Sequence, residues 1–447
     1  MLKNHPKGLL VAFFANMGER FGFYTMMAIL VLFLQAKFGL SAEKAGNIYS
    51  WFYFSIYALA LVGGILADAT KKYKTVILAG IIVMFAGYLV MAIPGMTLTI
   101  TIIGLFTIAF GNGLFKGNLQ AVVGQMYDNN EYSKHRDNAY MIFYMGINIG
   151  AFFAPFAATA MRNWWLKVNG FLHDGSLPAL CHRFLEGNLE DTSTLQQLAG
   201  SVNLTGPVTD LTAFAKDYLE VFSKGYNYAF GIAAGAMVIS LLVYIIFNRL
   251  LPEKQKSTAA TSEKVEFRIV PLLTALLAMV GVAYGLHFIK QVGWAAGFAF
   301  GLFAAFVTWI IMSSNKDEVK RVVALILVFA VVIFFWMSFH QNGLTLTLFA
   351  RDYTVKQVGP FTNLFFTLWS ILAVIGTIAG AILSLRKNIS RNARIAGIVL
   401  LLVSLSAAIL FYMNFSASNS ISPEIFQSFN PLFIVALTAL VLIIERL

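Results

Sequence analysis

Residues 76–94 have the sequence VILAGIIVMFAGYLVMAIP, which contains no charged side chain. An α-helix needs roughly 20 mostly apolar residues to cross the hydrocarbon core of a bilayer, so this run predicts a membrane-spanning helix. Further stretches of the chain are long and apolar enough for the same prediction. They lie at residues 9–35, 47–67, 97–124, 139–161, 226–248, 269–290, 293–313, 322–349, 362–385, 395–413 and 425–444.

The composition of the whole chain also indicates a membrane protein. Of its 447 residues, 59% are hydrophobic and 12% are charged, and its mean hydropathy is +0.74. Soluble domains carry about 25% charged residues, so an ordinary cytosolic enzyme or a free nucleic-acid-binding protein is excluded. The strands of an outer-membrane barrel would alternate in polarity over about ten residues, whereas these runs are long and continuous. The predicted fold class is an all-α polytopic membrane protein.

The basic residues predict the orientation of the chain. The net charge of +11 arises from 32 Lys and Arg against 21 Asp and Glu, and the basic residues cluster in short segments between predicted spans. The clusters are Lys3 and Lys7; Lys71, Lys72 and Lys74; Lys134, His135 and Arg136; Lys316, Lys320 and Arg321; and Arg386, Lys387, Arg391 and Arg394. Because such clusters stay in the cytoplasm, we expect a cytoplasmic N-terminus. The expected partner of the protein is the lipid bilayer, and the net positive charge is not taken to indicate binding to nucleic acid.

Two polar segments interrupt the apolar runs. Residues 162–225 are predicted to form a long outer loop, and residues 251–266 a cytoplasmic linker. Cys181 is the only cysteine and cannot form an intrachain disulfide. Together with His173 and His182 it matches no common metal spacing, so these three are interpreted as surface residues.

Ionisable side chains within the predicted spans are candidates for function, because charge at bilayer depth is costly and normally faces a cavity or a partner. Three- and four-residue steps place Asn16, Glu19, Arg20, Phe23, Tyr24 and Met27 on one face of the first span. Glu19 and Arg20 are adjacent, so they point about 100° apart and need not pair only with each other. A purely structural ion pair between helices is the alternative interpretation.

The fourth span contains a lysine in the run GNGLFKGNLQ at residues 111–120, where Asn112, Lys116 and Gln120 share one face. The lysine lies too deep for its amine to reach the interface comfortably. The spacing of a phosphate-binding loop is absent, and no strand precedes the run. Lys116 is therefore predicted to face a cavity.

The second and ninth spans add further polar candidates. Tyr53 and Tyr57 are four residues apart in the second span. His340 lies in the ninth, flanked by Gln341 and Asn342. A histidine titrates near neutral pH and can relay protons, although a hydrogen-bonded structural histidine is equally consistent with the sequence.

The end of the second span is predicted to have a structural role. Gly63 and Gly64 would permit close helix packing. Asp68 and the lysines that follow would form a cytoplasmic contact, with a solvated turn as the alternative.

These residues together predict a water-accessible cavity within the membrane. Its expected lining is Glu19, Arg20, Tyr24, Tyr57, Lys116, Asn148 and His340. Mixed charges and tyrosines suit a zwitterionic or otherwise polar small solute. The sequence contains no nucleotide-binding motif and no metal or cofactor motif, so uphill transport would draw on an ion gradient. No nucleophile–base pair is found within the spans, which argues against an enzyme.

Four motifs resemble the proton-dependent oligopeptide transporter family of the major facilitator superfamily. GERFGFYTM at residues 18–26 resembles the first-helix motif of the family, and GGILADATKKYKT at 63–75 the loop between its second and third helices. GNGLFKGN at 111–118 contains the lysine of the fourth helix, and FYMGINIGAFFAP at 143–155 is similar to the fifth-helix signature. The resemblance implies two six-helix bundles with alternating access, in which bacterial members often carry two extra helices, and a location in the cytoplasmic (inner) membrane.

The resemblance also implies roles for particular residues. Glu19, Arg20 and Lys116 would take part in proton coupling, and Lys116 also in substrate binding. A di- or tripeptide would contact Tyr24, Tyr57 and Asn148, and Gln341 is grouped with these substrate contacts. No cofactor is implied, because the proton gradient supplies the energy.

The sequence departs from the family pattern at several positions. The first Glu of the first-helix motif is Asn16, its first Tyr is Phe23, and an expected arginine is Met27. The usual Glu-Gln of the seventh family helix is His340-Gln341. We hypothesise that Met27 and His340 replace the basic and the acidic member of one gating pair of the family, and that both charges were lost together. His340 would then have taken over part of the proton-linked role.

The resemblance predicts the following organisation. Residues 1–250 would form the N-terminal six-helix bundle, residues 267–314 an extra helix pair, and residues 315–447 a partial C-terminal bundle with an inserted hairpin at about 361–413. Residues 422–440 resemble the start of the eighth family helix.

This assignment leaves only eight family helices in the chain. Truncation at the C-terminus is the favoured explanation, and twelve spans that form a complete transporter in another register are the alternative. Proton-coupled peptide symport is the leading function. A symporter of another small organic solute or anion, and a truncated, transport-inactive membrane protein, stay open. The sequence does not predict the oligomeric state.

Overall fold

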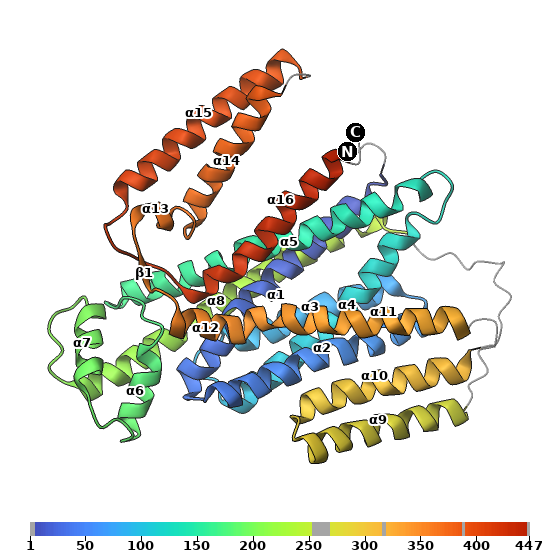
Figure 1. Cartoon of the computed structure of the whole chain (residues 1–447), viewed down its shortest axis with the longest axis horizontal. Helices are drawn as coiled ribbons and strands as arrows, with labels where there is room; N and C mark the ends of the chain where they lie inside the picture. Colours follow the sequence, from blue (N-terminus) through green and yellow to red (C-terminus); the bar gives the residue numbers. More distant parts are fainter. Residues whose placement is uncertain (1–4, 253–268, 315–318, 387–388, 445–447) are drawn as a thin grey trace.

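The computed structural model describes residues 5–252, 269–314, 319–386 and 389–444, and these ranges are almost entirely helical. Most of the predicted linker at 251–266 lies outside the described residues. Figure 1 shows long helices that run roughly side by side, with a two-helix hairpin standing apart from the rest. In the described ranges, the one sheet consists of β1 (Gln357–Val358) and β2 (Asn419–Ser420), which pair antiparallel.

The helices have the following bounds. They are α1 Gly8–Phe38, α2 Ala42–Thr70, α3 Tyr73–Ala92, α4 Leu98–Gln125, η2 Ser133–His135, α5 Arg136–Val168, α6 Leu177–Leu185, α7 Ser193–Val202, α8 Leu211–Phe247, η3 Asn248–Leu250, α9 Ile269–Lys290, α10 Trp294–Ser313, α11 Val319–Phe339, η4 His340–Gly343, α12 Thr345–Tyr353, α13 Pro360–Asn363, α14 Leu368–Leu385, α15 Arg391–Asn414, η5 Pro423–Ser428 and α16 Phe429–Ile444.

Local sequence signals explain several helix ends. Ser41, Thr97 and Asp210 each precede a helix and accept a hydrogen bond from a backbone N–H of its first turn. Such caps satisfy donors that have no partner within the helix. At the other end of α1, Gly39 adopts a left-handed conformation with φ 63°, and its N–H donates to the carbonyl of Gln35. Glycine adopts this conformation without a steric penalty.

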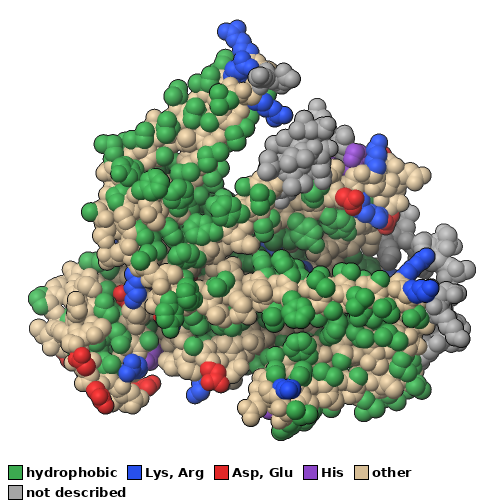
Figure 2. Space-filling model, in the orientation of Figure 1, with side chains coloured by type: hydrophobic (Ala, Val, Ile, Leu, Met, Phe, Trp, Pro, Cys, Tyr) green, Lys and Arg blue, Asp and Glu red, His purple; other side chains and the backbone are tan. Residues whose placement is uncertain are grey.

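Eleven helices among the described residues are long and apolar enough to cross a membrane. They correspond to eleven of the twelve predicted spans. The last predicted span, 425–444, covers the end of the short helix η5 and the 16 residues of α16. Figure 2 shows hydrophobic side chains over the visible faces of α11, α14 and α15, as expected for helices whose solvent is lipid.

Helices α1–α5 and α8 form a bundle with α1 at its centre. From Thr25 to Leu34 every residue of α1 is buried, so this segment is enclosed on all sides. Small residues bring its neighbours close. A Cβ added at Gly22 would lie 3.0 Å from the carbonyl oxygen of Ala233 in α8, and one at Gly150 in α5 would lie 2.7 Å from that of Met17. Close approach at small residues is the usual basis of helix packing in membranes.

Two predictions for residues 162–225 are wrong. The segment is not one long loop, because α5 continues to Val168, α8 begins at Leu211, and α6 and α7 lie between them. Cys181 is not a surface residue, since its side chain is fully buried in α6. His173 and His182 are half-buried, and the ring of His182 contacts the carbonyl oxygen of Ala36 at 2.8 Å.

The predicted ninth span, 322–349, is not continuous. Helix α11 ends at Phe339, and η4 and the short α12 follow, with Leu344 (φ −124°, ψ −90°) between them. His340 therefore lies at a break in a helix. Polar side chains lie beside the break. Irregular backbone at membrane depth is tolerated where it is buried in protein or lines a cavity.

The remaining helices lie around the bundle. The α9–α10 pair contacts the bundle through Trp51 in α2 and Phe298 in α10, whose ring centroids are 6.0 Å apart. Helices α14 and α15 form a hairpin that projects from the body, and α16 lies beside α5 (Figure 1). We call the end of the bundle that carries α6 and α7 the α6–α7 end.

The crossing of α2 and α4 is closest at Gly63. A Cβ added there would lie 2.1 Å from the carbonyl oxygen of Gly113, whereas one at Gly64 would meet nothing within 4 Å. Of these two glycines, only Gly63 is therefore in close contact with α4.

We expect Gly63→Ala to destabilise the protein by about 1–3 kcal/mol, because the methyl group forces α2 away from α4. Thermal unfolding of the purified protein in detergent would detect a lower melting temperature. Gly64→Ala is the matched control and should unfold like the wild type. Equal melting temperatures for all three proteins would contradict the packing at Gly63.

Candidate functional site

The first group of predicted residues forms a buried cluster within the bundle. Arg20 donates from Nε and Nη2 to the carboxylate of Glu19, with 2.8 Å between Nη2 and Oε1. From α4, the Nδ2 of Asn112 donates to the same Oε1 at 2.8 Å. All three residues are at least 96% buried. Adjacent in sequence, Glu19 and Arg20 pair directly, and Asn112 ties the pair to a second helix.

Two polar atoms near this cluster lack a hydrogen-bond partner among the described residues. They are Nδ2 of Asn16 and Oη of Tyr88. Both residues are 97% buried or more. Buried polar groups normally have a partner, and ordered water is one that can supply it in a polar interior.

The second group links the bundle to the broken helix. The amine of Lys116 lies 5.2 Å from the centre of the Tyr57 ring. Oη of Tyr57 lies 3.2 Å from Nε2 of His340. The tautomer of the imidazole decides which of these two atoms donates. The three residues come from α4, α2 and η4, and they form a chain of contacts from the bundle interior to the break after α11.

The imidazole of His340 is held by aromatic rings. Its centre lies 4.5 Å from that of Tyr53, and it stacks on Trp336 at 5.4 Å and 22°. The hydroxyl of Tyr49 donates to the backbone carbonyl of His340 at 3.2 Å. Both the position and the plane of the ring are therefore fixed.

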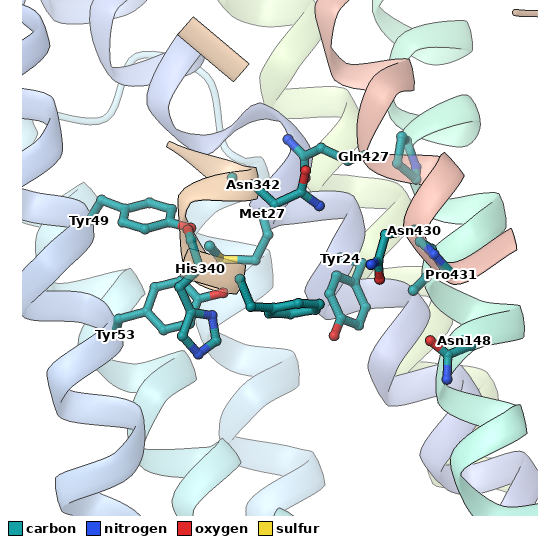
Figure 3. A pocket seen from close by; sticks show the side chains of 14 residues that line it. Tyr24, Met27, Tyr49, Tyr53, Asn148, His340, Asn342, Gln427, Asn430 and Pro431 are labelled. Carbon is teal, nitrogen blue, oxygen red and sulfur yellow. The ribbon is translucent and has the colours of Figure 1, made fainter. Parts of the chain in front are cut away.

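A pocket lies between these elements and the C-terminal segment. It is lined by Tyr24, Met27, Tyr49, Tyr53, Asn148, Ala151, Pro155, Phe339, His340, Asn342, Gly343, Gln427, Asn430 and Pro431. Figure 3 shows Tyr49 and Tyr53 on one side of the pocket and Asn148 on the other, with His340 between the two tyrosines and Tyr24. No acidic side chain belongs to this lining in the described part of the chain.

The structure brings some predicted residues to the pocket and places others elsewhere. Tyr24, Asn148 and His340 line it directly, while Tyr57 and Lys116 reach it only through His340. Gln341 does not line the pocket. Its side chain accepts from the hydroxyl of Thr345 at 2.5 Å, within the same break.

Asp68 lies away from the pocket, at the end of α2. It accepts a hydrogen bond from the hydroxyl of Tyr73 at the start of α3. This contact joins two consecutive helices of the bundle.

Sequence reasoning missed several residues of the pocket. Gln427 and Asn430 add two carboxamides to that of Asn342, which had been noted only as a neighbour of His340 in the sequence, and Gln427 donates to the hydroxyl of Thr347 at 2.7 Å. The signal was present in the sequence. The polar run SPEIFQSFNP at residues 422–431 precedes an apolar stretch, and polar groups at such a position indicate a cavity.

A buried ion pair was also missed. Arg162 in α5 donates to Glu424 in η5, and both side chains are fully buried. Arg162 is the first residue of the segment predicted as a loop, so it was not considered a residue of a membrane helix. Among the described residues, no group of three or more His, Cys, Asp or Glu could hold a metal ion.

Comparison with known proteins agrees with this architecture. The family profile described as the POT family matches residues 73–364, more than half of the chain. The peptide transporter YePEPT of Yersinia enterocolitica is 28% identical over 368 residues, which are 80% of this chain and 62% of that protein. Dipeptide and tripeptide permease A of Klebsiella pneumoniae is 36% identical over 162 residues, 36% of this chain and 32% of that protein. The matched regions thus span only 32% and 62% of the lengths of these relatives.

Solved structures show the same fold. The crystal structure of a POT family transporter in complex with 5-aminolevulinic acid has a TM-score of 0.53 at 18% identity, covering 100% of this chain and 92% of that chain. A structure of peptide transporter POT in complex with sulfate has a TM-score of 0.51 at 19% identity, covering 97% of this chain and 89% of that chain. The helices, the profile match and these neighbours together show that the chain has the major facilitator superfamily fold and belongs to the POT family.

Proposed function

We propose that the protein carries out proton-coupled symport of di- and tripeptides by alternating access. The observation that carries this proposal is the polar pocket between the bundle and the C-terminal segment, which Tyr57 and His340 connect to Lys116. Relatives named as peptide transporters support the substrate class. The family consists of transporters and not of enzymes.

Different residues of the site are assigned to peptide binding and to proton coupling. Tyr24, Asn148 and the carboxamides of Asn342, Gln427 and Asn430 offer donors and acceptors to the amide groups of a short peptide. The amine of Lys116 would attract the peptide carboxylate. The pair of Glu19 and Arg20, which is hydrogen-bonded to Asn112, would respond to the charge state of Lys116.

The path for the proton is proposed to run through His340. Its Nε2 faces Oη of Tyr57, whose ring faces the amine of Lys116. A proton taken up by the imidazole would place a second positive charge beside Lys116. Because like charges disfavour each other, protonation of His340 and of Lys116 would be coupled.

The energy available to such a symporter is sufficient for accumulation. One proton supplies about 1.4 kcal/mol per pH unit and about 2.3 kcal/mol per 100 mV of membrane potential. Together these terms support an accumulation on the order of several hundred-fold for one pH unit and 100 mV. No bound cofactor is needed for this coupling.

We also propose that the N-terminus is cytoplasmic and that the protein lies in the cytoplasmic (inner) membrane. Lys71 and Lys72 lie between α2 and α3, and Lys134 lies just before α5, at the end of the bundle where α1 begins. The positive-inside tendency favours this end for the cytoplasm. The α6–α7 end is then the outer end.

Two alternatives remain for the activity. The pocket presents His340, with Lys116 behind it, and its described lining contains no carboxylate, which favours an anionic solute as the second candidate substrate. A transport-inactive membrane protein is the third candidate.

Proteoliposomes that hold the purified chain should take up a labelled dipeptide when an inward proton gradient is applied. Lys116→Ala should reduce the uptake at least ~10-fold, because the charge that binds substrate and couples protons is removed. Lys224→Ala is the control, since that lysine is exposed and paired with Glu220. Uptake by the wild type that Lys116→Ala leaves unchanged would refute the assigned role.

Unlabelled competitors distinguish the substrate classes. Di- and tripeptides should suppress the uptake of the labelled dipeptide, and small organic acids without an amide bond should not, because the carboxamides of the pocket match peptide groups. Suppression by the organic acids alone would favour the anion symporter. Wild-type protein that is folded yet shows neither uptake nor counterflow would favour the inactive protein.

The role of His340 is tested by the pH dependence of uptake. His340→Gln keeps a polar side chain but cannot be protonated, so its uptake should vary less with outer pH than that of the wild type. His287→Gln is the matched control. That imidazole lies 2.9 Å from the carbonyl of Val292 in the turn between α9 and α10, away from the pocket. A pH profile of His340→Gln identical to that of the wild type would refute the proton-linked role.

A further inference from the structure

Two histidines that are distant in sequence meet at the end of the bundle where α1 begins. His5 precedes α1, and His135 lies in η2, between α4 and α5. The centres of their rings are 5.7 Å apart. Nδ1 of His5 lies 2.7 Å from Oη of Tyr127, which follows the end of α4. Both histidines are half-buried and Tyr127 is fully buried. We call these three residues the His5–Tyr127–His135 cluster.

The cluster attaches the segment before α1 to the end of α4. The rings of His5 and Tyr127 meet edge to face, with their centres 5.8 Å apart at 64°. The start of α1 is tightly packed beside this contact. A Cβ added at Gly8 would lie 2.5 Å from the carbonyl oxygen of Leu250 in η3 and 3.0 Å from Sδ of Met126. His5 therefore helps to cover Tyr127 at a point where the ends of α4 and α8 meet the first turn of α1.

The other charged and titratable groups on these segments are either engaged with one another or exposed. Asp128 pairs with Arg136. The hydroxyl of Tyr132 is hydrogen-bonded to Glu131. The exposed charged side chains are those of Lys7 in the segment before α1, Lys134 in η2, Asp137 in α5 and Arg249 in η3.

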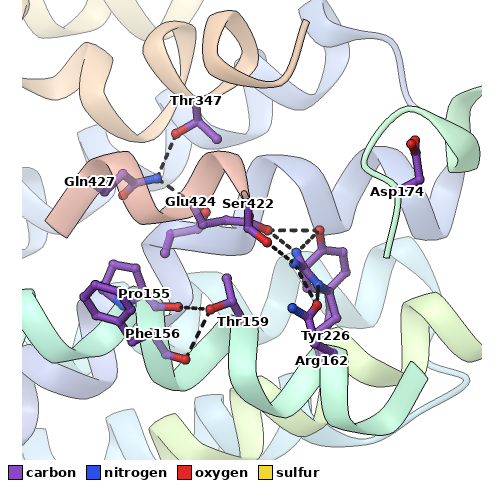
Figure 4. A network of polar contacts seen from close by, with 12 residues as sticks. Pro155, Phe156, Thr159, Arg162, Asp174, Tyr226, Thr347, Ser422, Glu424 and Gln427 are labelled. Atoms are coloured by element: carbon purple, nitrogen blue, oxygen red, sulfur yellow. Dashed lines mark hydrogen bonds and ion pairs between the residues drawn. The ribbon is translucent and has the colours of Figure 1, made fainter. Parts of the chain in front are cut away.

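The histidines differ in this respect from the charged groups at the α6–α7 end. Figure 4 shows the guanidinium of Arg162 in contact with Glu424, Ser422 and Tyr226, so a carboxylate balances its charge. Within the described ranges, neither His5 nor His135 forms an ion pair with a carboxylate. Protons taken up by the two imidazoles therefore add positive charge that no paired carboxylate neutralises.

Protonation of the two imidazoles weakens the contact through charge. A protonated His5 can still donate from Nδ1 to Oη of Tyr127, so the hydrogen bond itself is not the sensitive element. The charge of this imidazolium would lie against a buried phenol and face a second imidazolium, and both burial and like charge disfavour it. Accordingly, burial lowers the pKa of His5, and the neighbouring His135 lowers this pKa further. Burial raises the pKa of Tyr127 to about 12, so the phenol stays neutral and supplies no balancing charge.

The stability of the contact therefore rises with pH. The docked segment binds the proton of His5 more weakly than a segment released into water, because the pKa is lowered only in the docked form. The contact is fully favoured above the usual histidine pKa of about 6.5, and it is lost as the pH falls through the lowered pKa of docked His5.

We propose that His5 and His135 form a proton-sensitive clasp, which holds the segment before α1 on Tyr127 while both imidazoles are neutral and releases it when they are protonated. With the orientation proposed above, the clasp faces the cytoplasm. Protons that enter with a substrate would then favour release and free the start of α1 from the end of α4. The clasp itself does not depend on transport.

The solvent exposure of Tyr127 tests the clasp. Hydroxyl radicals modify exposed tyrosines, and mass spectrometry gives the rate of modification for each residue. In the purified full chain, we expect Tyr127 to be protected at about pH 8 and to be modified at least ~3-fold faster at about pH 5.5, because His5 no longer covers it. A return to the higher pH should restore the protection.

Tyr244 is the internal control for unfolding. It is 1% exposed, and its hydroxyl donates to the backbone carbonyl of Lys74 at 3.0 Å, without contact to a histidine. Its ring should stay protected at both pH values. Equal loss of protection at Tyr127 and Tyr244 would overturn the clasp, because the bundle itself would then open in acid.

Three variants and one control assign the effect to the two imidazoles. His5→Gln/His135→Gln should make the modification of Tyr127 independent of pH, since neither ring remains. His135→Gln alone removes the repulsion, so release should need a lower pH than in the wild type. Asp128→Asn should keep the wild-type pH dependence, because its exposed pair with Arg136 is not part of the clasp. His287→Gln, in the turn between α9 and α10, is the matched control and should behave like the wild type.

An equal rate of modification of wild-type Tyr127 at both pH values would overturn the clasp, as would a double variant with the wild-type pH dependence. Loss of the pH dependence in Asp128→Asn would assign it to the Asp128–Arg136 pair instead. The measurement needs no transport. Absence of peptide uptake by the wild type would therefore refute the proposed function and leave the exposure of Tyr127 unaffected.

Discussion

A charged side chain within a bilayer persists only where the protein supplies its partner, and the polar architecture of this chain depends on that constraint. Glu19 and Arg20 meet it within one helix turn, with Asn112 as a third member. Arg162 and Glu424 meet it across the molecule. The first pair lies within one helix, whereas the second joins α5 to the C-terminal segment. The same physical requirement is therefore met once locally and once by a contact between residues 262 positions apart in sequence.

The spans were predictable from the sequence because lipid demands long apolar runs wherever a helix crosses it. The break within the run 322–349 was not predicted, although η4 has the polar sequence HQNG at residues 340–343. His340 was singled out in the sequence as an unusual residue, yet its place just after the end of α11 was not predicted. The position of such a break is decided by tertiary contacts, here the hydroxyl of Tyr49 on the carbonyl of His340.

Partners distant in sequence were the other limit of prediction. Gly63 and Gly64 are indistinguishable in the sequence, and only the position of Gly113 shows which of them faces a neighbour. Arg162 was assigned to a loop because a charge usually ends a predicted span, and its partner Glu424 could not be identified without the fold. Tyr24 and Asn148 were accessible to prediction because family motifs contain them. Gln427 and Asn430 lie in a segment where the resemblance concerned only the start of a helix.

The structure also connects the ion pair to the pocket. Gln427 follows Glu424 by three residues in η5 and donates to Thr347 in α12, which continues from the break that holds His340. η5 is thus joined by this hydrogen bond to the segment that follows the imidazole. The contact between Tyr57 in α2 and His340, at 3.2 Å, joins the same break to the bundle. The Arg162–Glu424 pair and the chain of contacts from Lys116 to His340 are therefore connected through η5, α12 and η4.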